Sequence, residues 1–581
     1  MPQSDRFRTV LTAIAVLTAG ALVGAVIARV AGPPPARTPV AALAGCTDRI
    51  ETGASTRAQS GSPGVVTGGV VESGGEGCEA APPGPPGPPA TGTAPATGTA
   101  PAAGAVAVGE DGFTRDGRPF FWLGDTAWAL FGRLDRDEVE TYLDTRAEQG
   151  FTVIQAVAVF PQTERENAYG DAPYGAGLDD LTVTPGADPG DEQQYDYWDH
   201  VDFVLDAAAD RGLVIGLLPV WGDRQAGSLV TTGNARAFGE FLGERFGGAD
   251  NLVWIMGGDA PAGGVEDVWR ELAAGIDAAG GGGRPMTYHP RGDQTSVEWF
   301  AEDSWIDFHM LQGGHCLRYD VRAALLEETR AAGLPFLDGE PIYEDHPYCW
   351  DNPPEGYSTA LDVRRDAWWA VLGGAAGHTY GHHAVWQFLA EGREPRLGAR
   401  GDWRTALGFP AAGQMRHLRA LVESRPRFEP ADELVAEPGS GAERISAALA
   451  TDSSSLVVYT AAGRGIEADL GALAGPQARP WWFDPRTGEA TELESVAAGG
   501  RVRFDPPGEE DWVLVIDSVD AAYGPPGGAP LTQAVAGEPE QGAGSGEPVE
   551  GAAAPAGAVP PAADPDRPAA SPAGLSGSVT A

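Results

Sequence analysis

The sequence contains no lysine, so all 39 of its basic residues are arginines, against 82 aspartates and glutamates. The formal net charge of −43 argues against a nucleic-acid partner, because nothing on the chain would offset phosphate repulsion. The same excess of acid argues against a polybasic membrane-binding patch. Composition therefore excludes classes of partner but does not identify a chemistry.

Familiar hydrolase motifs are also missing. Neither HExxH nor GxSxG occurs in the sequence, which argues against zincin proteases, the usual serine hydrolases and a collagen-degrading protease. The stretch HTYGHH (378–383) is rich in histidine, but in a strand His378 and His382 would share one face while His383 would point the other way. No acidic ligand is clearly paired with them. We therefore predict no metal and no cofactor.

The four cysteines are few but informative. Cys46 and Cys78 lie in low-complexity sequence, whereas Cys316 and Cys349 lie within a globular region. Their number fits an oxidising compartment. Cys316 and Cys349 form a candidate disulfide, although sequence alone does not establish pairing.

One long apolar run occurs near the N-terminus. Arg6 and Arg8 precede 19 uncharged residues, 10–28. This length and flank predict that residues 1–31 are either a transmembrane anchor or a cleaved signal peptide. The rest of the protein would then be exported, either anchored at the cell surface or secreted. A lipobox-like LAGC ends at Cys46, but GPPPARTP separates it from the apolar run, so lipoprotein processing is weakly supported.

Composition divides the remaining chain into four parts. Residues 32–105 are rich in Pro, Gly and Ala and predict a disordered stalk, and residues 521–581 predict a disordered tail. Residues 430–520 contain short alternating strands typical of a β-sandwich, with a hairpin turn at 484–489. Residues 106–425 alternate apolar, strand-like runs with helical segments such as 136–150 and 197–212.

The larger region fits a (β/α)₈ TIM barrel, an α/β fold. A doubly wound open sheet is the main alternative, but no glycine fingerprint follows the first strand. Apolar runs of this kind are typical of parallel strands covered on both faces. The eight predicted strands are 119–128, 152–160, 213–221, 251–259, 284–290, 306–312, 334–340 and 376–386.

Two carboxylates end strands on opposite sides of this predicted barrel. Asp259 closes the fourth strand in WIMGGD, and Glu340 closes the seventh in FLDGE. Because the carboxyl ends of barrel strands form the active-site mouth, the two groups can flank one glycosidic bond. The simpler interpretations are that Asp259 caps the next helix and that Glu340 binds a backbone turn.

Other strand ends carry residue types that bind sugars. Aromatic rings stack on sugar C–H surfaces, and amide or imidazole groups bind hydroxyls, although many such residues serve only packing. The candidate substrate-binding residues are Asp125, Trp128, Gln155, Trp221, His289, His309, Gln312, Tyr380, His382 and Trp386.

Several separated motifs together carry a family resemblance. They are DGRPFFWLGDTAW, RAEQGFTVIQAVAVF, YWDHVDFVLDAAADRGLVIGLLPVW, NLVWIMGGD and DGEPIYE. The region that contains them resembles the apiosidase-like (DUF4038) glycoside hydrolases, related to glycoside hydrolase family 140. The C-terminal region is similar to a collagen-binding-type β domain, a label that says little about its ligand here.

The resemblance implies a TIM barrel and a retaining mechanism without cofactor, with Asp259 as acid/base and Glu340 as nucleophile. It implies a carbohydrate substrate, a plant or microbial glycan, but not the sugar, the linkage or the oligomeric state. A retaining enzyme would place the two carboxyl groups about 5–5.5 Å apart, and a wider gap would favour inversion. The alternative is a non-catalytic surface glycan-binding protein, which would not need both carboxylates to face each other.

Overall fold

The computed structural model describes residues 104–161, 165–191, 193–350 and 355–531. A small antiparallel sheet opens this part of the chain, and its strands pair in the order β1-β2-β3. These strands are β1 (Val106–Gly109), β2 (Gly112–Arg115) and β3 (Arg118–Pro119). The predicted signal or anchor, stalk and C-terminal tail lie almost wholly outside the described residues, so the structure does not test those predictions.

The central sheet confirms the predicted barrel. Eight of its strands in the described chain are parallel and are joined in the order β8-β7-β6-β5-β4-β12-β11-β10, with β9 added antiparallel to β10. Each parallel strand falls inside one of the eight predicted ranges. The strands are β4 (Trp122–Thr126), β5 (Val153–Val159), β6 (Val214–Val220), β7 (Leu252–Gly257), β8 (Met286–His289), β9 (Gln294–Thr295), β10 (His309–Gln312), β11 (Phe336–Asp338) and β12 (Gly377–Tyr380).

The barrel closes between β8 and β10 without a regular strand ladder. The Asp307 N–H donates to the Met286 carbonyl at 3.0 Å, and the Thr287 hydroxyl donates to the Phe308 carbonyl at 2.6 Å. These bonds satisfy backbone groups that would otherwise be buried without partners. The fourth and seventh barrel strands are therefore β7 and β11.

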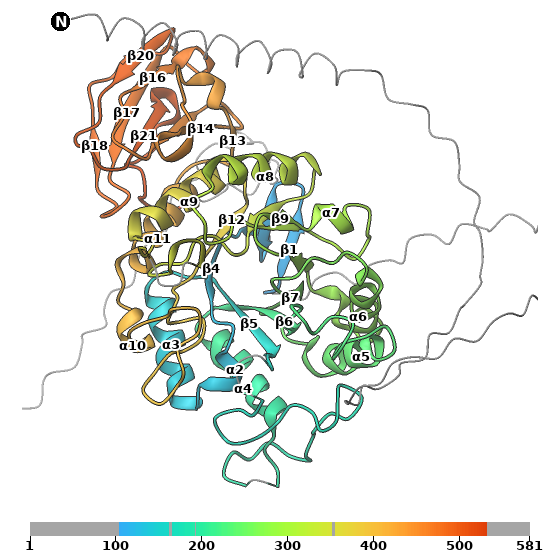
Figure 1. Cartoon of the computed structure of the whole chain (residues 1–581). Coiled ribbons are helices and arrows are strands. Elements are labelled where there is room, and N and C mark those ends of the chain that lie inside the picture. Colours follow the sequence, from blue (N-terminus) through green and yellow to red (C-terminus); the bar gives the residue numbers. More distant parts are fainter. Residues whose placement is uncertain (1–103, 162–164, 192, 351–354, 532–581) are drawn as a thin grey trace, which may run out of the picture. The chain divides into compact units, whose positions relative to one another are not determined.

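Helices surround the strands (Figure 1). The predicted helices 136–150 and 197–212 correspond to α3 and α4, whose N-caps Asp135 and Asp196 each form a capping box. The helices are α2 (Leu130–Arg133), α3 (Arg136–Glu148), α4 (Tyr197–Asp210), α5 (Ala235–Phe246), α6 (Glu266–Ala278), α7 (Val297–Phe300), α8 (Tyr319–Ala331), α9 (Ala360–Leu372), α10 (Trp403–Ala406) and α11 (Pro410–Glu423).

The C-terminal region forms two antiparallel sheets around a separate apolar core, as predicted. The larger has the order β13-β14-β15-β21-β17-β18, with β19 paired to β17, and the smaller pairs β16 with β20. The predicted hairpin turn is present, since the Asp484 N–H donates to the Glu489 carbonyl. The strands are β13 (Phe428–Pro430), β14 (Ile445–Ala450), β15 (Ser455–Thr460), β16 (Ile466–Asp469), β17 (Gln477–Phe483), β18 (Ala490–Glu492), β19 (Val496–Ala497), β20 (Arg501–Phe504) and β21 (Trp512–Ser518).

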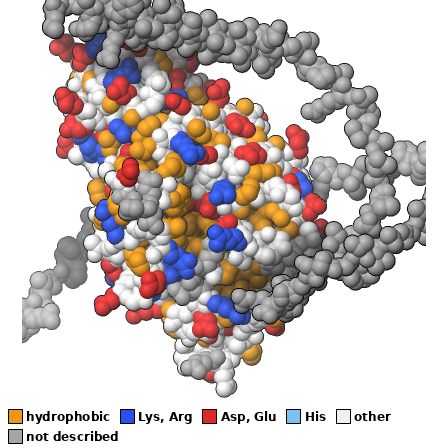
Figure 2. Space-filling view, in the orientation of Figure 1, with side chains coloured by type: hydrophobic (Ala, Val, Ile, Leu, Met, Phe, Trp, Pro, Cys, Tyr) orange, Lys and Arg blue, Asp and Glu red, His pale blue; other side chains and the backbone are white. Residues whose placement is uncertain are grey.

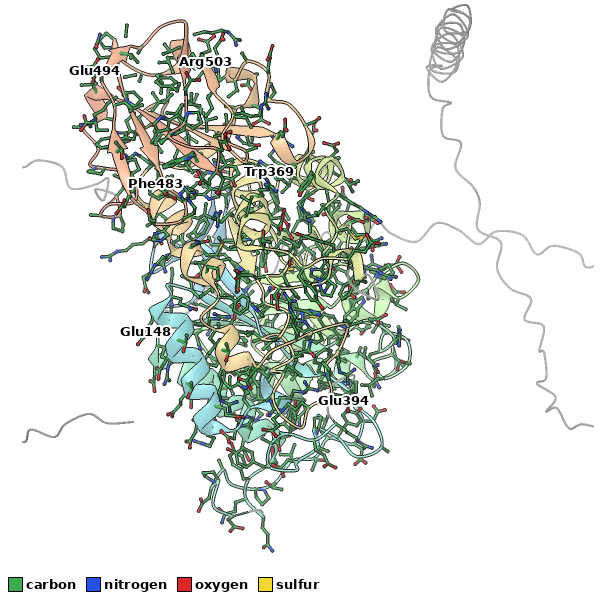
Figure 3. All side chains as sticks on the ribbon, turned by 60° about the vertical axis from the view of Figure 1, so that its left-hand side comes forward. Glu148, Trp369, Glu394, Phe483, Glu494 and Arg503 are labelled. Carbon is green, nitrogen blue, oxygen red and sulfur yellow. A yellow bond between two sulfur atoms is a disulfide. The ribbon has the colours of Figure 1, made fainter. Side chains whose placement is uncertain are left out.

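Helix α9 joins the barrel to the C-terminal sheet. Trp368 stacks on Tyr459 with ring centroids 5.8 Å apart, and Arg364 makes two hydrogen bonds of 2.7 Å to the buried Asp511. Trp369 and Phe483, labelled in Figure 3, belong to the same apolar cluster. A shared core of this kind indicates a structural role for the C-terminal domain, because separating the two would expose apolar surface and break a buried ion pair.

The surface mixes both signs of charge. Acidic and arginine side chains are interspersed on the face shown in Figure 2. No helix within the described ranges is both long and apolar enough to cross a membrane.

Candidate active site

A sharp turn after β7 presents Asp259. Gly257, Gly258 and Asp259 all have positive φ, at 85°, 114° and 47°. A Cβ on Gly257 would lie 2.4 Å from the His289 carbonyl oxygen, and one on Gly258 would lie 2.7 Å from the Trp221 ring. Only glycine permits this close approach, and Asp259 itself is strained, as is typical of functional positions.

Asp259 does not cap a helix. Helix α6 begins at Glu266, and its N-cap is Val265, which makes no side-chain cap bond. The capping interpretation of Asp259 is therefore wrong. The side chain is partly exposed and stands at the carboxyl end of the barrel.

Glu340 follows β11 and is nearly buried, with 5% of its surface exposed. Its Oε1 lies 3.1 Å from His315 Nε2, a hydrogen bond, and its Oε2 lies 3.2 Å from His289 Nε2, a contact that is less well aligned. Its side chain thus faces imidazoles rather than a backbone turn.

His289 lies between the two acids. The Asp259 N–H donates to His289 Nδ1 at 3.3 Å, so the proton of the neutral ring sits on Nε2, which faces Glu340. One imidazole at the end of β8 therefore touches the turn that carries Asp259 and the carboxylate of Glu340. The charge of Glu340 also acts on the Asp259 carboxyl group, so the two acids lie in one electrostatic environment.

The two acids have oppositely shifted pKa values. Burial, reinforced by the nearby charge of Glu340, raises the pKa of Asp259 to about 7. Burial also acts to raise the pKa of Glu340, but its contacts with His289 and His315 outweigh this and lower it to about 2. Near neutral pH one acid is available as a proton donor while the other is ionised, which is how paired carboxylates divide acid and nucleophile roles.

Aromatic residues line the same side of the barrel. The ring centroids of Trp128 and Trp221 are 5.1 Å apart, and those rings lie 5.4 Å and 6.1 Å from His289. Trp128 Nε1 donates to the Tyr343 hydroxyl at 3.0 Å. Burial, the charge of Glu340 and a hydrogen bond to it hold the pKa of Tyr343 well above its usual value, so Tyr343 stays a neutral donor.

Two further predicted residues lie near this cluster. Gln155 on β5 donates from its amide to the Gly339 carbonyl at 2.8 Å, directly before Glu340 in the chain. Trp386 donates from Nε1 to His383 Nδ1 at 3.1 Å, and its ring lies 6.4 Å from that of Phe160, which contacts Trp221. Five of the predicted substrate-binding residues are therefore brought toward Glu340 by the fold: Gln155, Trp386, Trp128, Trp221 and His289.

The remaining five predicted substrate-binding residues have other contacts. Asp125 is fully buried and accepts hydrogen bonds from Tyr142 and from Arg146, the latter at 2.7 Å, on the outer side of β4. Tyr380 donates to Glu344 at 2.8 Å. Within the described residues, no hydrogen bond or ring contact joins the side chains of Asp125, Tyr380, His309, Gln312 or His382 to Asp259 or Glu340. His309 hydrogen-bonds Ser296, and the ring of His382 packs on Phe409.

The predicted site residues did not include His315 and Tyr343, both of which contact Glu340. His315 follows β10 in GGHC, and Tyr343 follows β11 in PIYEDH. Both lie in loops, where no periodicity indicates which way a side chain points. Tyr343 lies in the family motif DGEPIYE, three residues after Glu340, and His315 directly precedes Cys316; these positions are signals that could have found them.

The candidate disulfide is confirmed. Cys316 and Cys349 are bonded, with Cα atoms 4.4 Å apart. The Cys349 N–H also donates to the His315 carbonyl at 3.1 Å. The bridge therefore fixes the loop after β11 against the histidine that contacts Glu340.

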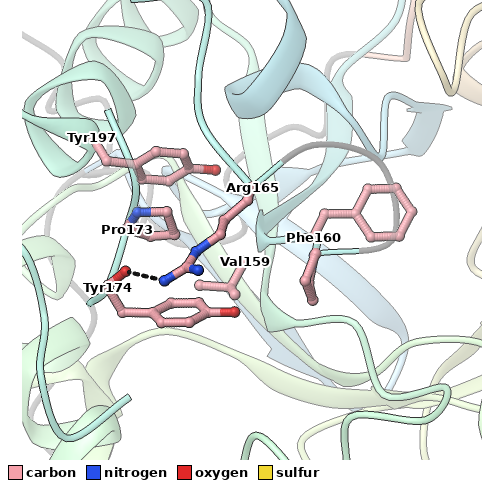
Figure 4. Close-up of a pocket in the computed structure, with 7 residues that line it drawn as sticks. Val159, Phe160, Arg165, Pro173, Tyr174 and Tyr197 are labelled. Atoms are coloured by element: carbon pink, nitrogen blue, oxygen red, sulfur yellow. Dashed lines mark hydrogen bonds between the residues drawn. The ribbon is translucent and has the colours of Figure 1, made fainter. Parts of the chain in front are cut away.

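A small cavity of about 10 Å³ lies beside the cluster rather than within it (Figure 4). That volume holds roughly one water molecule. Arg165 donates to the Tyr174 carbonyl there at 3.3 Å, and Phe160 connects the cavity to Trp221. The lining residues are Val159, Phe160, Pro161, Arg165, Pro173, Tyr174 and Tyr197.

The histidine-rich stretch does not assemble a metal centre. His383 is occupied by Leu397 and Trp386, and His382 Nδ1 accepts from the Ala384 N–H. Across the described ranges no group of three or more His, Cys, Asp or Glu side chains is arranged to hold a metal ion.

Comparison with known families gives two matches. Residues 111–429 match the family described as "Apiosidase-like, catalytic domain", and residues 430–517 match that described as "Putative collagen-binding domain of a collagenase". The first match alone covers more than half of the chain. No curated protein sequence matches.

Two solved structures are similar over most of the chain. One, titled "Glycoside hydrolase", is 32% identical with a TM-score of 0.67, over 72% of this chain and 98% of that one. A glycoside hydrolase family 5 protein from Bacteroides vulgatus ATCC 8482 has the same identity, TM-score and coverage of this chain, and 94% of its own chain is covered. A further Bacteroides vulgatus protein, 16% identical with a TM-score of 0.53 over 71% of this chain and 82% of that one, shares the fold alone.

Proposed function

Since the chain belongs to the apiosidase-like family of glycoside hydrolases, we propose that it cleaves its glycan by a retaining, two-carboxylate mechanism with Asp259 as acid/base and Glu340 as nucleophile. The observation that carries the proposal is that the Asp259 backbone N–H and the Glu340 carboxylate contact the same imidazole, His289, while the pKa values of the two acids shift in opposite directions. We further propose that the enzyme acts outside the cytoplasm.

The first step forms a covalent glycosyl-enzyme. The ionised Glu340 attacks the anomeric carbon and the bond from that carbon to the leaving oxygen breaks. Protonated Asp259 gives its proton to that oxygen, so the aglycone departs as a neutral alcohol. His315 and His289 hold the attacking carboxylate, and the low pKa of Glu340 keeps it ionised when Asp259 is protonated.

The second step releases the sugar. Asp259, now ionised, removes a proton from a water molecule that attacks the anomeric carbon, and the bond to Glu340 breaks. Asp259 is restored to its protonated form and Glu340 to its carboxylate. Two inversions give net retention of configuration.

The family supports a glycan substrate. Trp128 and Trp221 are nearly buried and pack against His289. Apiose-containing pectin is the first glycan to test. The Cys316–Cys349 disulfide and the predicted N-terminal signal or anchor both support export to an oxidising compartment.

A glycan panel tests the proposal. Residues 106–520 and the full chain would be incubated with apiose-containing pectin and other plant and microbial polysaccharides, with released sugars measured by chromatography. The wild type releases sugar, and Asp259→Ala and Glu340→Ala do not. Glu148→Gln, which removes an exposed carboxylate from α3, is the matched control and retains full activity.

Thermal melts of each variant separate catalysis from folding. Undiminished release by folded Asp259→Ala or Glu340→Ala contradicts the assigned roles. Binding of a panel glycan without hydrolysis by the wild type favours the non-catalytic glycan-binding protein.

A further inference from the structure

Trp350 is unusually exposed for a tryptophan, with 45% of its surface accessible. It follows Cys349 directly, and both residues have positive φ, at 64° and 51°. This conformation is unfavourable for residues with a side chain, and its persistence means that surrounding contacts enforce it. The disulfide to Cys316 and the bond from the Cys349 N–H to the His315 carbonyl are two such contacts.

The ring contacts of Trp350 anchor one part of the indole. His315 and His346 are stacked, with centroids 4.2 Å apart and planes 24° apart. Trp350 lies 4.9 Å from the first at 81° and 4.3 Å from the second at 84°. The indole is therefore packed perpendicular to both imidazoles, and 45% of the residue's surface stays accessible.

His315 links Trp350 to the proposed nucleophile. Its ring contacts the indole, and its Nε2 bonds Glu340 Oε1 at 3.1 Å. The exposed indole is thus one imidazole away from Glu340. A flat apolar ring at that distance suits the C–H surface of a sugar next to the one at Glu340.

Resting on the proposed function, we propose that Trp350 is a substrate-binding residue whose exposed indole face stacks on a sugar ring next to the one attacked by Glu340. The Cys316–Cys349 disulfide holds Trp350 and His315 together, so a single covalent link aligns the stacking face with the nucleophile. Removing the indole weakens binding of substrates long enough to reach it and leaves the chemical step in place.

The test compares Trp350→Ala with Trp350→Phe, which keeps a stacking ring. The probe is the shortest oligosaccharide of apiose-containing pectin, or of another panel glycan, that the wild type cleaves. For Trp350→Ala the KM rises roughly tenfold with kcat within about twofold, and Trp350→Phe recovers most of the loss. Tyr169→Ala, which removes an aromatic of similar exposure (43%), is the matched control and leaves KM unchanged.

A second readout does not need turnover. In the Glu340→Gln background the oligosaccharide is titrated by calorimetry, and adding Trp350→Ala weakens its binding about tenfold. The Cys316→Ser, Cys349→Ser double variant weakens binding in the same direction. Equal KM and equal affinity with and without the indole would overturn the inference while hydrolysis by the wild type leaves the proposed function intact. A wild type that binds a panel oligosaccharide without cleaving it fails the proposed function instead, and titration of that oligosaccharide with and without Trp350→Ala still decides the role of Trp350.

Discussion

Asp125 on β4 and Asp259 after β7 both lie near the carboxyl ends of barrel strands, and their surroundings differ. Asp125 at the end of β4 is buried against Arg146 and Tyr142, and the guanidinium opposes the effect of burial on its pKa. Within the described residues Asp259 after β7 forms no salt bridge, and the carboxylate of Glu340 adds to the effect of burial on its pKa. Burial raises the pKa of both acids, but the strongest neighbouring charge lowers it at Asp125 and raises it further at Asp259.

The sides of the barrel that carry Asp125 and Asp259 also differ. Near β4 and β12, Asp125 pairs with Arg146 and Tyr380 with Glu344. Near β7, β8 and β11, Glu340 contacts His289 and His315, and His289 also accepts from the Asp259 N–H. Substitutions near Glu340 and Asp259 should therefore change activity, whereas substitutions around Asp125 should change stability.

Removing the nucleophile has the largest effect. Glu340→Gln keeps the shape of the side chain but cannot attack the anomeric carbon, so kcat falls roughly 10⁴-fold or more. Initial rates of sugar release on the panel glycan, with thermal melts to establish folding, measure this. A folded Glu340→Gln enzyme within tenfold of the wild type would remove Glu340 from the mechanism.

Removing the acid/base has the next largest effect. Asp259→Asn lowers activity roughly 10²–10⁴-fold on substrates with poor leaving groups, because the departing oxygen then lacks its proton. The loss is smaller for an activated aryl glycoside, whose leaving group needs no protonation. An equal loss on both substrates contradicts the acid role.

On the structural side, Arg146→Met affects stability instead of chemistry. It leaves the buried Asp125 carboxylate uncompensated, and the free energy of unfolding falls by about 3–5 kcal/mol. Urea unfolding measures the change, and Arg146→Met combined with Asp125→Asn recovers part of it. Activity per folded molecule is unchanged, and a specific loss of kcat would instead place Asp125 in the site.

The pH profile follows from the two shifted pKa values. The active form needs Glu340 ionised, which holds above about pH 2, and Asp259 protonated, which holds below about pH 7. The value of kcat/KM is therefore flat through mildly acidic pH and falls tenfold per pH unit above about 7. Rates measured in overlapping buffers check this, and a profile that rises from pH 6 to pH 9 contradicts it.

The smallest effect is on stability at the reactive side. The pKa of Asp259 is higher in the folded protein than its ordinary value of 3.8, so the folded state loses stability as pH rises from about 4 to about 7. Asp259→Asn removes this penalty and raises the melting temperature at pH 8 more than at pH 4. An identical shift at both values would show that Asp259 is not destabilised when ionised.

Sequence reasoning was strongest where a pattern repeats. The apolar runs predicted all eight barrel strands, and the order of those strands placed Asp259 and Glu340 across from each other. It could not decide which way a strand-end side chain points, because neighbouring residues of a strand face opposite sides. Hence Asp125 was predicted to bind substrate, although it faces α3. His315 and Tyr343 were missed because long-range folding, and not local pattern, brings their loops to Glu340.

The stereochemistry of the first sugar released separates a retaining from an inverting mechanism. Time-resolved NMR of the anomeric proton during hydrolysis by the wild type distinguishes retention from inversion before mutarotation mixes the products. We expect retention, together with a glycosyl adduct on Glu340 detected by mass spectrometry of the Asp259→Ala variant. Initial release of the inverted anomer, with no adduct on Glu340, would contradict the roles given to both carboxylates.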